Sequence, residues 1–565
     1  MTTFPRIDDV LKALPQEMEN LLLHGSVGSQ HLERVAGTGL QRIHEVGCDC
    51  TDSLYAMCGD ILLHGFGDNP LDGNFVQRVL SWELPDAVLS IDHKAVQLLV
   101  ARMYQPPKNL NYFYRLQQQR DYDKLFQYLE KQLEREPMNL FWRVQLLQLC
   151  LFRHEYQKAE DTLSIDVPTL LAPLFAAQKA PIAWLKGEYD KAFSLYEETE
   201  SFFGAGYSKS RCAALALQMD NKERALQLFA EALEYSPWAT SAMLVYYDLL
   251  MQKDTLEALP PGKTTIALYS WNKCEDLKDT LESLFASDIG DAKVVVLNNG
   301  STDGTAAMLD EFKSKHPDQL TIEHLPVNIG APAARNWLMA MDIVKTSDFT
   351  VYLDDDIVLP ENWLRKFGAA IKSYPEADVW GCKVADHDSP ALMQNADLHL
   401  IFNHGTDERT PAPDYTSLKP NPFRFTNLHT QCFDLNNFSY MRPCSSVTGC
   451  CHMFRTTTLL DNGGFSLYLS PTQYDDMEHD IRLGKKGKIC VYQGHVKILH
   501  KRNTGEASNV PGAASGNDLA NRYKMQTMHD RLDIADVIHT QQGILRDDIN
   551  KKAAELTAFF AEDSE

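Results

Sequence analysis

The 565-residue sequence has no apolar run of about 18 residues, the length that a transmembrane helix needs. Its first residues, MTTFPRIDDVLKALPQEMEN, also lack the basic and then apolar pattern of a signal peptide. These absences predict a cytoplasmic protein with no membrane span. The 12 cysteines agree, because they are scattered through apolar contexts, and the group Cys48, Cys50 and Cys58 lacks the paired spacing of a zinc site.

Positive charge is also scarce. The chain has 54 Lys and Arg residues against 77 Asp and Glu residues, a net charge of −23 at pH 7. This balance disfavours nucleic acid and anionic membranes as partners, because both attract cationic surfaces. A hydrophobic content of 44% and an aromatic content of 10% indicate packed cores, and the length predicts about two to four domains.

An internal repeat runs through residues 111–250. Small or apolar anchor residues recur every 33 or 34 positions, and a tyrosine stands three residues before each of the first three anchors: Leu125, Ala159, Ala192 and Ala225, with Tyr122, Tyr156 and Tyr189. The pattern resembles the tetratricopeptide repeat, which implies helical pairs over residues 111–255. The repeat either forms only a helical core or offers a groove to a peptide or partner protein. Residues 1–110 are expected to be helical, and their role is unreadable.

After a linker that ends in Pro260-Pro261-Gly262, strand patterns alternate with helical patterns. Apolar strand-like segments occur at 265–270, 293–298, 321–325 and 348–354. Successive strand and helix units predict an α/β domain with a parallel, doubly wound sheet, whose ligands bind at the carboxyl ends of the strands. Polar clusters stand at each of those ends, so we expect the site there.

The fourth strand ends in three consecutive carboxylates, Asp354, Asp355 and Asp356. Two carboxylates with this spacing can share a divalent cation, and hard oxygen ligands suit Mg²⁺ or Mn²⁺. A cation there can neutralise a diphosphate. Acidic triplets also occur as solvated turns, so the inference depends on the surrounding motifs.

Together these motifs resemble the GT-A, family 2 glycosyltransferases. The segments that carry the resemblance are Ser270-Trp271-Asn272-Lys273, Asn298-Asn-Gly-Ser301, Asn328-x-Gly330 with Arg335-Asn336, Asp354-Asp355-Asp356, Gly449-Cys-Cys-His-Met-Phe-Arg455, Gly463-Gly464-Phe465, Tyr474-Asp475-Asp476 and His500. The resemblance covers residues 263–500 and implies an α/β GT-A (Rossmann-like, mostly parallel sheet) catalytic domain. An all-α solenoid precedes this domain, and a flexible loop and C-terminal helices at 501–565 follow it.

The resemblance implies a nucleotide-sugar donor and a Mn²⁺ or Mg²⁺ cofactor. It places Asp356, Asp354 and His500 at the metal, and we expect Asp356 to face a cleft and not the core. Donor-binding roles fall on Ser270, Trp271, Asn272, Asn298, Gly330, Arg335, Asp354 and Asp355. Asn298 stands where the family often has an aspartate that accepts the uracil N3–H, and an amide oxygen can accept the same bond. A UDP-sugar is therefore expected, although this departure leaves the base open.

The same resemblance places the catalytic base at Asp476, with Asp475 as the alternative. A carboxylate on the acceptor side removes the acceptor proton as the glycosidic bond forms, which implies an inverting reaction. The other interpretation of these residues is an acidic first turn of a helix, which the helix dipole favours. Glu478 and Arg482 are four residues apart and are expected to pair across one helical turn.

The acceptor cannot be read from the sequence. A solenoid before a transferase favours a protein or peptide side chain as acceptor, held by the repeats and neutral or basic in charge. The alternatives are a lipid-linked or polysaccharide acceptor, or a catalytically dead repeat scaffold. Residues 382–445 are expected to recognise the acceptor, and residues 501–517 to form either a lid over the donor or a linker.

Overall fold

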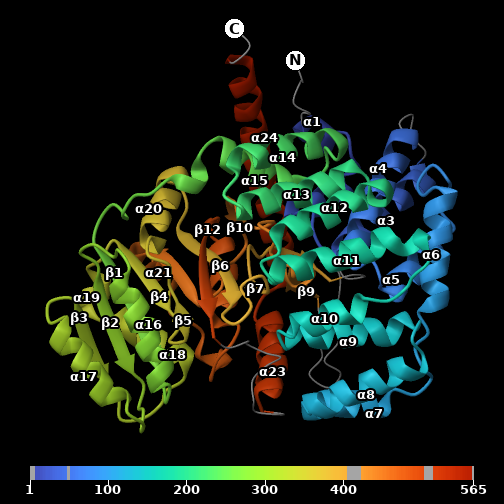
Figure 1. Cartoon of the computed structure of the whole chain (residues 1–565). Helices are drawn as coiled ribbons and strands as arrows, with labels where there is room; N and C mark the ends of the chain where they lie inside the picture. Colours follow the sequence, from blue (N-terminus) through green and yellow to red (C-terminus); the bar gives the residue numbers. More distant parts are fainter. Residues whose placement is uncertain (1–6, 47–50, 404–421, 502–512, 563–565) are drawn as a thin grey trace. The chain divides into compact units, whose positions relative to one another are not determined.

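The computed structural model describes residues 7–46, 51–403, 422–501 and 513–562 (Figure 1). The chain divides into two compact units. The first contains residues 1–246, 431–437 and 555–565, and the second contains residues 247–430 and 438–554. Among the described residues, no helix is both long enough and apolar enough to cross a membrane.

Described residues of the first unit are all-helical up to residue 246. The N-terminal helices are α1 (Ile7–Lys12), α2 (Gln16–His24), α3 (Ser29–Val46), α4 (Thr51–Asp68), α5 (Gly73–Leu80) and α6 (Ile91–Met103). The following helices are α7 (Asn111–Gln119), α8 (Tyr122–Arg135), α9 (Leu140–Phe152), α10 (Tyr156–Leu163), η1 (Thr169–Leu171), α11 (Ala172–Leu185), α12 (Tyr189–Phe203), α13 (Ala205–Gln218), α14 (Lys222–Tyr235) and α15 (Thr240–Leu250). The prediction of an all-helical N-terminal region is confirmed.

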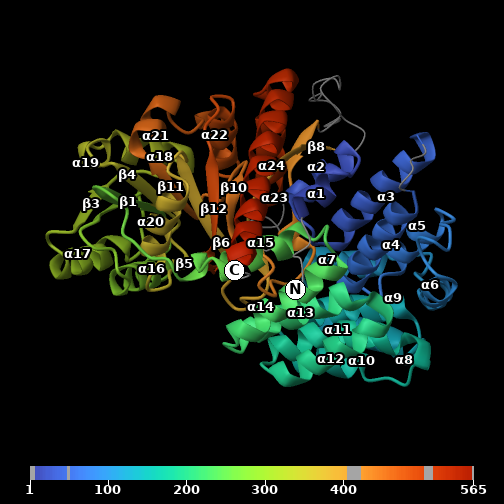
Figure 2. The ribbon, with the colours of Figure 1, turned by 90° about the horizontal axis from the view of Figure 1, so that it is seen from above.

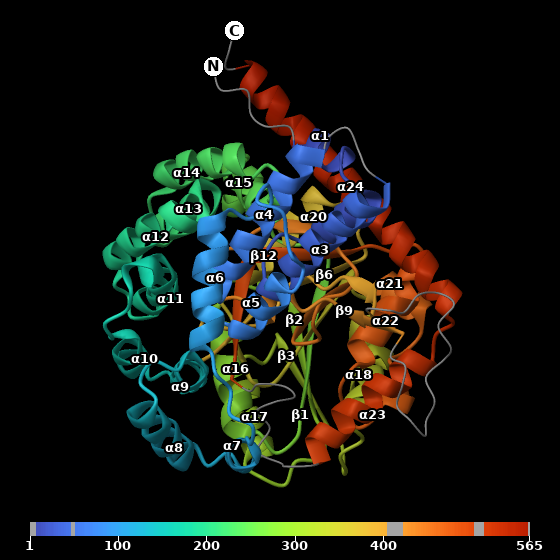
Figure 3. The same ribbon diagram turned by 90° about the vertical axis from the view of Figure 1, so that its right-hand side faces the viewer.

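The repeat seen in the sequence appears in alternate helices of this unit. The four anchors lie on α8, α10, α12 and α14, each no more than 3% exposed, and the three tyrosines are the first residues of α8, α10 and α12. Asp121 and Asn221 cap α8 and α14 through hydrogen bonds from the backbone N–H of Lys124 and Arg224. Helices α8 to α14 follow one another along an arc (Figure 3). Their assignment to the tetratricopeptide family stays a prediction.

The second unit is built around a ten-stranded sheet. Its strands are β1 (Thr264–Ser270), β2 (Lys293–Asn298), β3 (Leu320–His324), β4 (Phe349–Leu353), β5 (Ile357–Val358), β6 (Val379–Asp386), β7 (Met393–Asn395), β10 (Met441–Cys444), β11 (Cys451–Arg455) and β12 (Cys490–His500). The order is β10-β12-β6-β11-β4-β1-β2-β3, with β5 beside β12 and β7 beside β6. On this path only β10 and β11 run against the other strands, so the sheet is mixed and mostly parallel, as predicted.

Helices cover this sheet because its strands are apolar on both faces. Strand β4 is buried at every residue, as is typical of a parallel strand between two helical layers. Figure 1 shows α16, α17 and α18 against β1–β3. The helices of this region are α16 (Cys274–Ala286), α17 (Thr305–Lys315), α18 (Ala331–Ala340), α19 (Asp342–Lys345) and α20 (Trp363–Ser373).

The carboxyl-terminal part of the second unit adds a smaller apolar cluster. It contains the two-stranded sheet of β8 (Leu400–Phe402) and β9 (Phe423–Phe425), with α21 (Thr456–Asn462), α22 (Asp475–Gly484), α23 (Ala513–Thr527) and α24 (Arg531–Glu562) nearby, and the short turns η3 (Leu428–Thr430) and η4 (Leu467–Leu469). The short turn η2 (Lys253–Thr255) lies at the start of the unit, after α15. Helix α24 runs alongside α22 (Figure 2), and Val537 and Ile538 pack with Ile481 of α22.

Asp248, in the part of α15 that belongs to the second unit, contacts the sheet. The Asp248 carboxylate accepts a hydrogen bond from the Met441 backbone N–H at 2.7 Å and lies 2.8 Å from His495 Nε2. These contacts tie residue 248 to β10 and β12, and the end of the repeats at residue 255 stays a prediction. These contacts of Asp248 could not be predicted, because an aspartate within an apolar helix pattern does not reveal a partner far along the chain.

Candidate active site

Polar residues gather where the parallel strands end. Ser270 ends β1 and is paired in register with Asn298, which ends β2, while Asp354 directly follows β4 on the other side of β1. Because parallel strands finish at one edge of the sheet, three segments separated in sequence meet there. This is the edge at which the sequence predicted the site.

The predicted base-binding residues are partly engaged with one another. Asn298 is buried, its Oδ1 accepts a hydrogen bond from the Ser301 N–H at 3.0 Å, and its Nδ2 lies 3.1 Å from His324 Nδ1. Asn272 Oδ1 accepts from the Thr302 N–H at 2.7 Å. A base contact to Asn298 would therefore have to use the second lone pair of its amide oxygen. Ser270 is buried, whereas Trp271 is half exposed and open to stacking.

Asp355 and Asp356 are both buried and share one lysine. Lys273 Nζ lies 2.8 Å from Asp355 Oδ1 and 2.9 Å from Asp356 Oδ2. Burial lowers the pKa of Lys273, but the two carboxylates outweigh burial and raise it above its ordinary value. The expectation that Asp356 faces a cleft is wrong, because its side chain is 3% exposed. The end of β4 is instead a compact ion cluster, in which the Lys273 ammonium supplies the positive charge.

His500 completes this cluster from the end of β12. Its Nε2 lies 3.0 Å from Asp356 Oδ1, and its Nδ1 lies 2.6 Å from Gln394 Oε1. Burial lowers the pKa of His500, but the hydrogen bond and charge of Asp356 raise it above its ordinary value. Burial would raise the pKa of Asp356, and the contacts with His500 and Lys273 hold it below its usual range. The structure thus brings Asp356 and His500, two of the three predicted metal residues, into contact.

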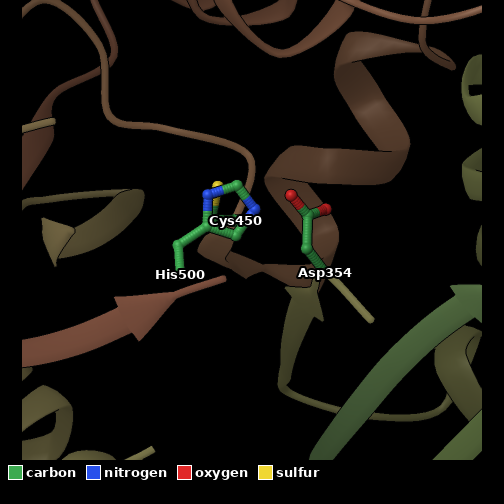
Figure 4. Close-up of side chains that lie close together, drawn as sticks. All are labelled: Asp354, Cys450 and His500. Carbon is green, nitrogen blue, oxygen red and sulfur yellow. The ribbon is translucent and has the colours of Figure 1, made fainter. Parts of the chain in front are cut away.

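A metal site fits the chemistry of these side chains. Ligand atoms of Asp354, Cys450 and His500 lie within 4.8 Å of one another, and Figure 4 shows the His500 ring and the Asp354 carboxylate side by side. Burial raises the pKa of the Cys450 thiol well above its ordinary value, which disfavours the thiolate that metals bind. Mn²⁺ and Mg²⁺ prefer oxygen, and Mn²⁺ accepts imidazole, so Asp354 and His500 are the members of this group that suit them, and the role of Asp356 as a ligand stays a prediction.

Arg335 joins the donor edge to the predicted catalytic helix. It extends from α18, is buried, and its Nη1 lies 2.6 Å from Asp475 Oδ2, while its Nη2 lies 3.8 Å from Asp354 Oδ1. Burial lowers the pKa of Arg335, but the nearby carboxylates, Asp475 first, raise it well above its ordinary value. Gly330 precedes α18 with φ +82°, where a side chain would be strained and would lie 3.2 Å from the Pro471 carbonyl oxygen.

Asp476 is held by backbone N–H groups and not by a cation. Its Oδ2 accepts a hydrogen bond from the Gly449 N–H at 2.7 Å, and its Oδ1 accepts from the Met477 N–H at 2.8 Å. A Cβ on Gly449 would lie 2.6 Å from Arg335 Nη2 and 2.8 Å from Asp476 Oδ2, so only glycine allows this approach. Asp475 is paired with Arg335, whereas each oxygen of Asp476 accepts one backbone hydrogen bond and has a further lone pair that a substrate could use. Glu478 and Arg482 pair as predicted, at 2.9 Å.

Asp476 borders a cavity of about 470 Å³. The wall includes Arg335, Asp354, Gln394, Leu398, residues 424–427, His429, residues 448–450, residues 472–477, Asp518 and Arg522. Part of the predicted acceptor segment, residues 382–445, thus lies in this wall, while 404–421 lie outside the described residues. Of the proposed lid, 502–512 also lie outside them, and 513–517 belong to α23.

Comparison with known proteins fits this geometry. The family model described as Glycosyl transferase family 2 matches residues 265–458. The chain contains a family 2 glycosyltransferase domain. Over 92 residues it is 30% identical to the poly-beta-1,6-N-acetyl-D-glucosamine synthase of Staphylococcus epidermidis, a match that spans 16% of this chain and 22% of the relative. The chain thus covers about a fifth of that relative's length.

Two solved structures are similar to the chain. A mannosyltransferase of Pyrobaculum calidifontis in complex with GDP-Man and Mn²⁺ matches with a TM-score of 0.34 and 16% identity, over 60% of this chain and 87% of that one. GalNAc-T7 with UDP, GalNAc and Mn²⁺ matches with a TM-score of 0.33 and 12% identity, over 46% of this chain and 50% of that one.

Within the family 2 domain, sequence reasoning missed Lys273, Gln394 and Gly449. Lys273 was noticed only as part of a motif, although a lysine directly after a polar strand end is a signal for an anion contact. Gln394 had no such signal, and Gly449 was recognised only as the start of a motif, because their contacts, with His500 and Asp476, join segments far apart in the sequence.

His429, in the cavity wall, gives a testable pH dependence. Burial lowers its pKa from 6.5 to about 4, so the folded protein keeps it neutral. Between these values the unfolded chain binds a proton that the folded chain does not, and the free energy of unfolding must fall as the pH falls. We expect His429→Gln to remove up to about 1.4 kcal/mol per pH unit of this slope. Urea denaturation of both proteins from about pH 7 to pH 5 measures it; identical slopes would contradict the assignment.

Proposed function

We propose that the protein is a metal-dependent, inverting glycosyltransferase that moves a sugar from a nucleotide-sugar donor to an acceptor in the cavity beside Asp476. The observation that carries this proposal is the arrangement inside the family 2 domain. Asp354 and Arg335 border the same cavity as Asp476, so a donor at the strand ends and an acceptor against Asp476 would meet there.

The donor side supplies groups for a nucleoside diphosphate. Trp271 offers an exposed ring to the base, Asp354 offers a carboxylate to the ribose, and Arg335 offers its guanidinium to the diphosphate. A bound Mn²⁺ or Mg²⁺ would be held by Asp356, Asp354 and His500 and would supply positive charge for the leaving diphosphate. Metal binding at His500 requires the neutral imidazole, so it should release a proton. A UDP-sugar remains the expected donor.

The acceptor side supplies the base. As the acceptor oxygen or nitrogen forms its bond to the anomeric carbon, its proton passes to the Asp476 carboxylate. The bond between the anomeric carbon and the diphosphate breaks, and its electron pair leaves with the nucleoside diphosphate. The Gly449 and Met477 N–H groups fix the carboxylate, so that a single displacement with inversion follows.

Nucleotide release tests the proposal against the dead-scaffold alternative. The full-length protein is incubated with Mn²⁺ and a panel of UDP-, GDP- and other nucleotide sugars, and both binding and release of nucleoside diphosphate are recorded. Slow metal-dependent release with one donor supports a transferase. Absence of binding and turnover across the panel would instead support a repeat scaffold whose transferase domain is inactive.

The helical repeats are proposed to hold a protein or peptide acceptor. We expect a fragment that begins at Tyr247, so that Asp248 keeps its contacts with β10 and β12, to retain donor hydrolysis and lose transfer to the true acceptor. If this fragment melts normally and glycosylates the acceptor at the full rate, the repeats do not hold the acceptor. The relative's name, a polysaccharide synthase, keeps a polysaccharide acceptor as the second candidate.

A further inference from the structure

Two arginines line the cavity from elements outside the strand ends. Arg424 is the middle residue of β9, and Arg522 lies on α23; both line the cavity that contains Asp476. Arg335, the third arginine of the wall, is already paired with Asp475. The pairing of Arg335 with Asp475 does not account for the positive charges of Arg424 and Arg522.

The elements that carry them are fixed to the catalytic helix. Phe423 of β9, Met525 of α23 and Ile481 of α22 belong to one buried apolar cluster. In addition, Gln526 Nε2 donates a hydrogen bond to the Phe423 carbonyl oxygen at 2.6 Å. The two arginines and Asp476 thus stand on three elements packed around one core, which holds the backbones of β9 and α23 beside the helix that carries Asp476.

Neither arginine has a carboxylate within ion-pair distance among the described residues. Arg424 Nη1 lies 3.2 Å from Asn427 Oδ1, a neutral partner, and burial lowers the pKa of Arg424 with no neighbouring anion to oppose it. Asp518, one turn before Arg522, accepts a hydrogen bond from the Tyr474 hydroxyl at 2.9 Å. A half-buried guanidinium without a counter-charge is costly, and an anionic ligand would remove that cost.

We propose that Arg424 and Arg522 bind an anionic group of the acceptor, a phosphate or a carboxylate, and so present its nucleophilic atom to Asp476. A guanidinium fork suits such oxygens, and two forks select an oxyanion over a neutral hydroxyl. This inference rests on the proposed transferase function and names its acceptor class. The net charge of the whole chain favours a neutral or basic acceptor, whereas the wall of the cavity sets a different local preference.

The proposed anion site is tested with pairs of small acceptors, one anionic and one neutral. The full-length enzyme is used with Mn²⁺ and with the donor identified in the nucleotide-sugar panel. Glycerol 3-phosphate is compared with glycerol, and methyl glucuronide with methyl glucoside, by the acceleration of nucleoside diphosphate release over the rate without acceptor. We expect the anionic member of at least one pair to act at about 10- to 100-fold lower concentration than its neutral partner. The first pair reports a phosphate, the second a carboxylate.

Arg424→Gln and Arg522→Gln should each reduce this preference by about 10-fold, and Arg424→Lys and Arg522→Lys should keep part of it. Arg365→Gln is the matched control, because Arg365 pairs with Asp288 away from the cavity. Equal use of anionic and neutral probes by the wild type, or a full preference in both Gln variants, would overturn the inference. Donor release without acceptor is measured first, so that failure of the transferase proposal is recognised separately.

Discussion

Replacing Asp476 by asparagine should abolish sugar transfer and leave donor binding unchanged. The substitution keeps the volume of the side chain and lets its amide oxygen accept the hydrogen bond from the Gly449 N–H, now 2.7 Å from Oδ2. It removes the ability to take a proton, together with the negative charge and the acceptor for the Met477 N–H, which now lies 2.8 Å from Oδ1. Because general base catalysis contributes about 10²- to 10⁴-fold, we expect a loss of transfer of this order, with the dissociation constant of the donor unchanged within about twofold.

Asp475→Asn is the informative comparison. Asp475 lies 2.6 Å from Arg335 Nη1 and is buried, so its loss leaves a buried guanidinium without its main partner. That variant should melt at a lower temperature and bind donor more weakly. Donor affinity is measured by titration calorimetry and transfer by product formation. If Asp476→Asn weakens donor binding as much as it slows transfer, Asp476 belongs to the donor site and not to the acceptor site.

The strand ends could be predicted because their sequence pattern is local. Phe349–Leu353 is a mostly apolar, β-branched and aromatic run that acidic residues follow, and buried parallel strands have this form. The same reasoning located the polar turn after Val294–Val296 and the small anchors of the helical repeat. These features depend on neighbours within a few residues, which a single sequence displays.

Contacts between distant segments could not be predicted in the same way. The pairing of Lys273 with Asp355 and Asp356 depends on how β1 and β4 align, and that of Arg335 with Asp475 depends on where α22 packs. Such alignments are set by the whole core. The cost of burying a charge then decides which carboxylate is paired, so Asp475 rather than Asp476 meets the arginine. The positions of Arg424 and Arg522 in the cavity wall likewise depend on how β9 and α23 pack.

Replacing Asp356 by asparagine should remove metal-dependent donor binding from a protein that still folds. Asp356 is the most enclosed of the three carboxylates, and it contacts both His500 Nε2 and Lys273 Nζ. Asparagine keeps the shape and one hydrogen-bond acceptor but lacks the negative charge that a divalent cation needs. Loss of groups that only support metal ligands already costs about 10- to 100-fold in affinity, so we expect at least about 100-fold for a ligand.

The choice of asparagine over alanine follows from the burial of Asp356. Alanine would leave the Lys273 ammonium with one carboxylate and His500 Nε2 with no partner at this position, and breaking a buried pair costs about 3–5 kcal/mol. Asp356→Ala should therefore melt well below the wild type, whereas Asp356→Asn, which keeps the volume and one acceptor but loses the charge, should melt between the two. Mn²⁺ binding is measured by calorimetry and by the Mn²⁺-induced rise in melting temperature. Wild-type Mn²⁺ affinity in a folded Asp356→Asn protein would show that Asp356 only anchors Lys273 and His500, and that the cation binds elsewhere.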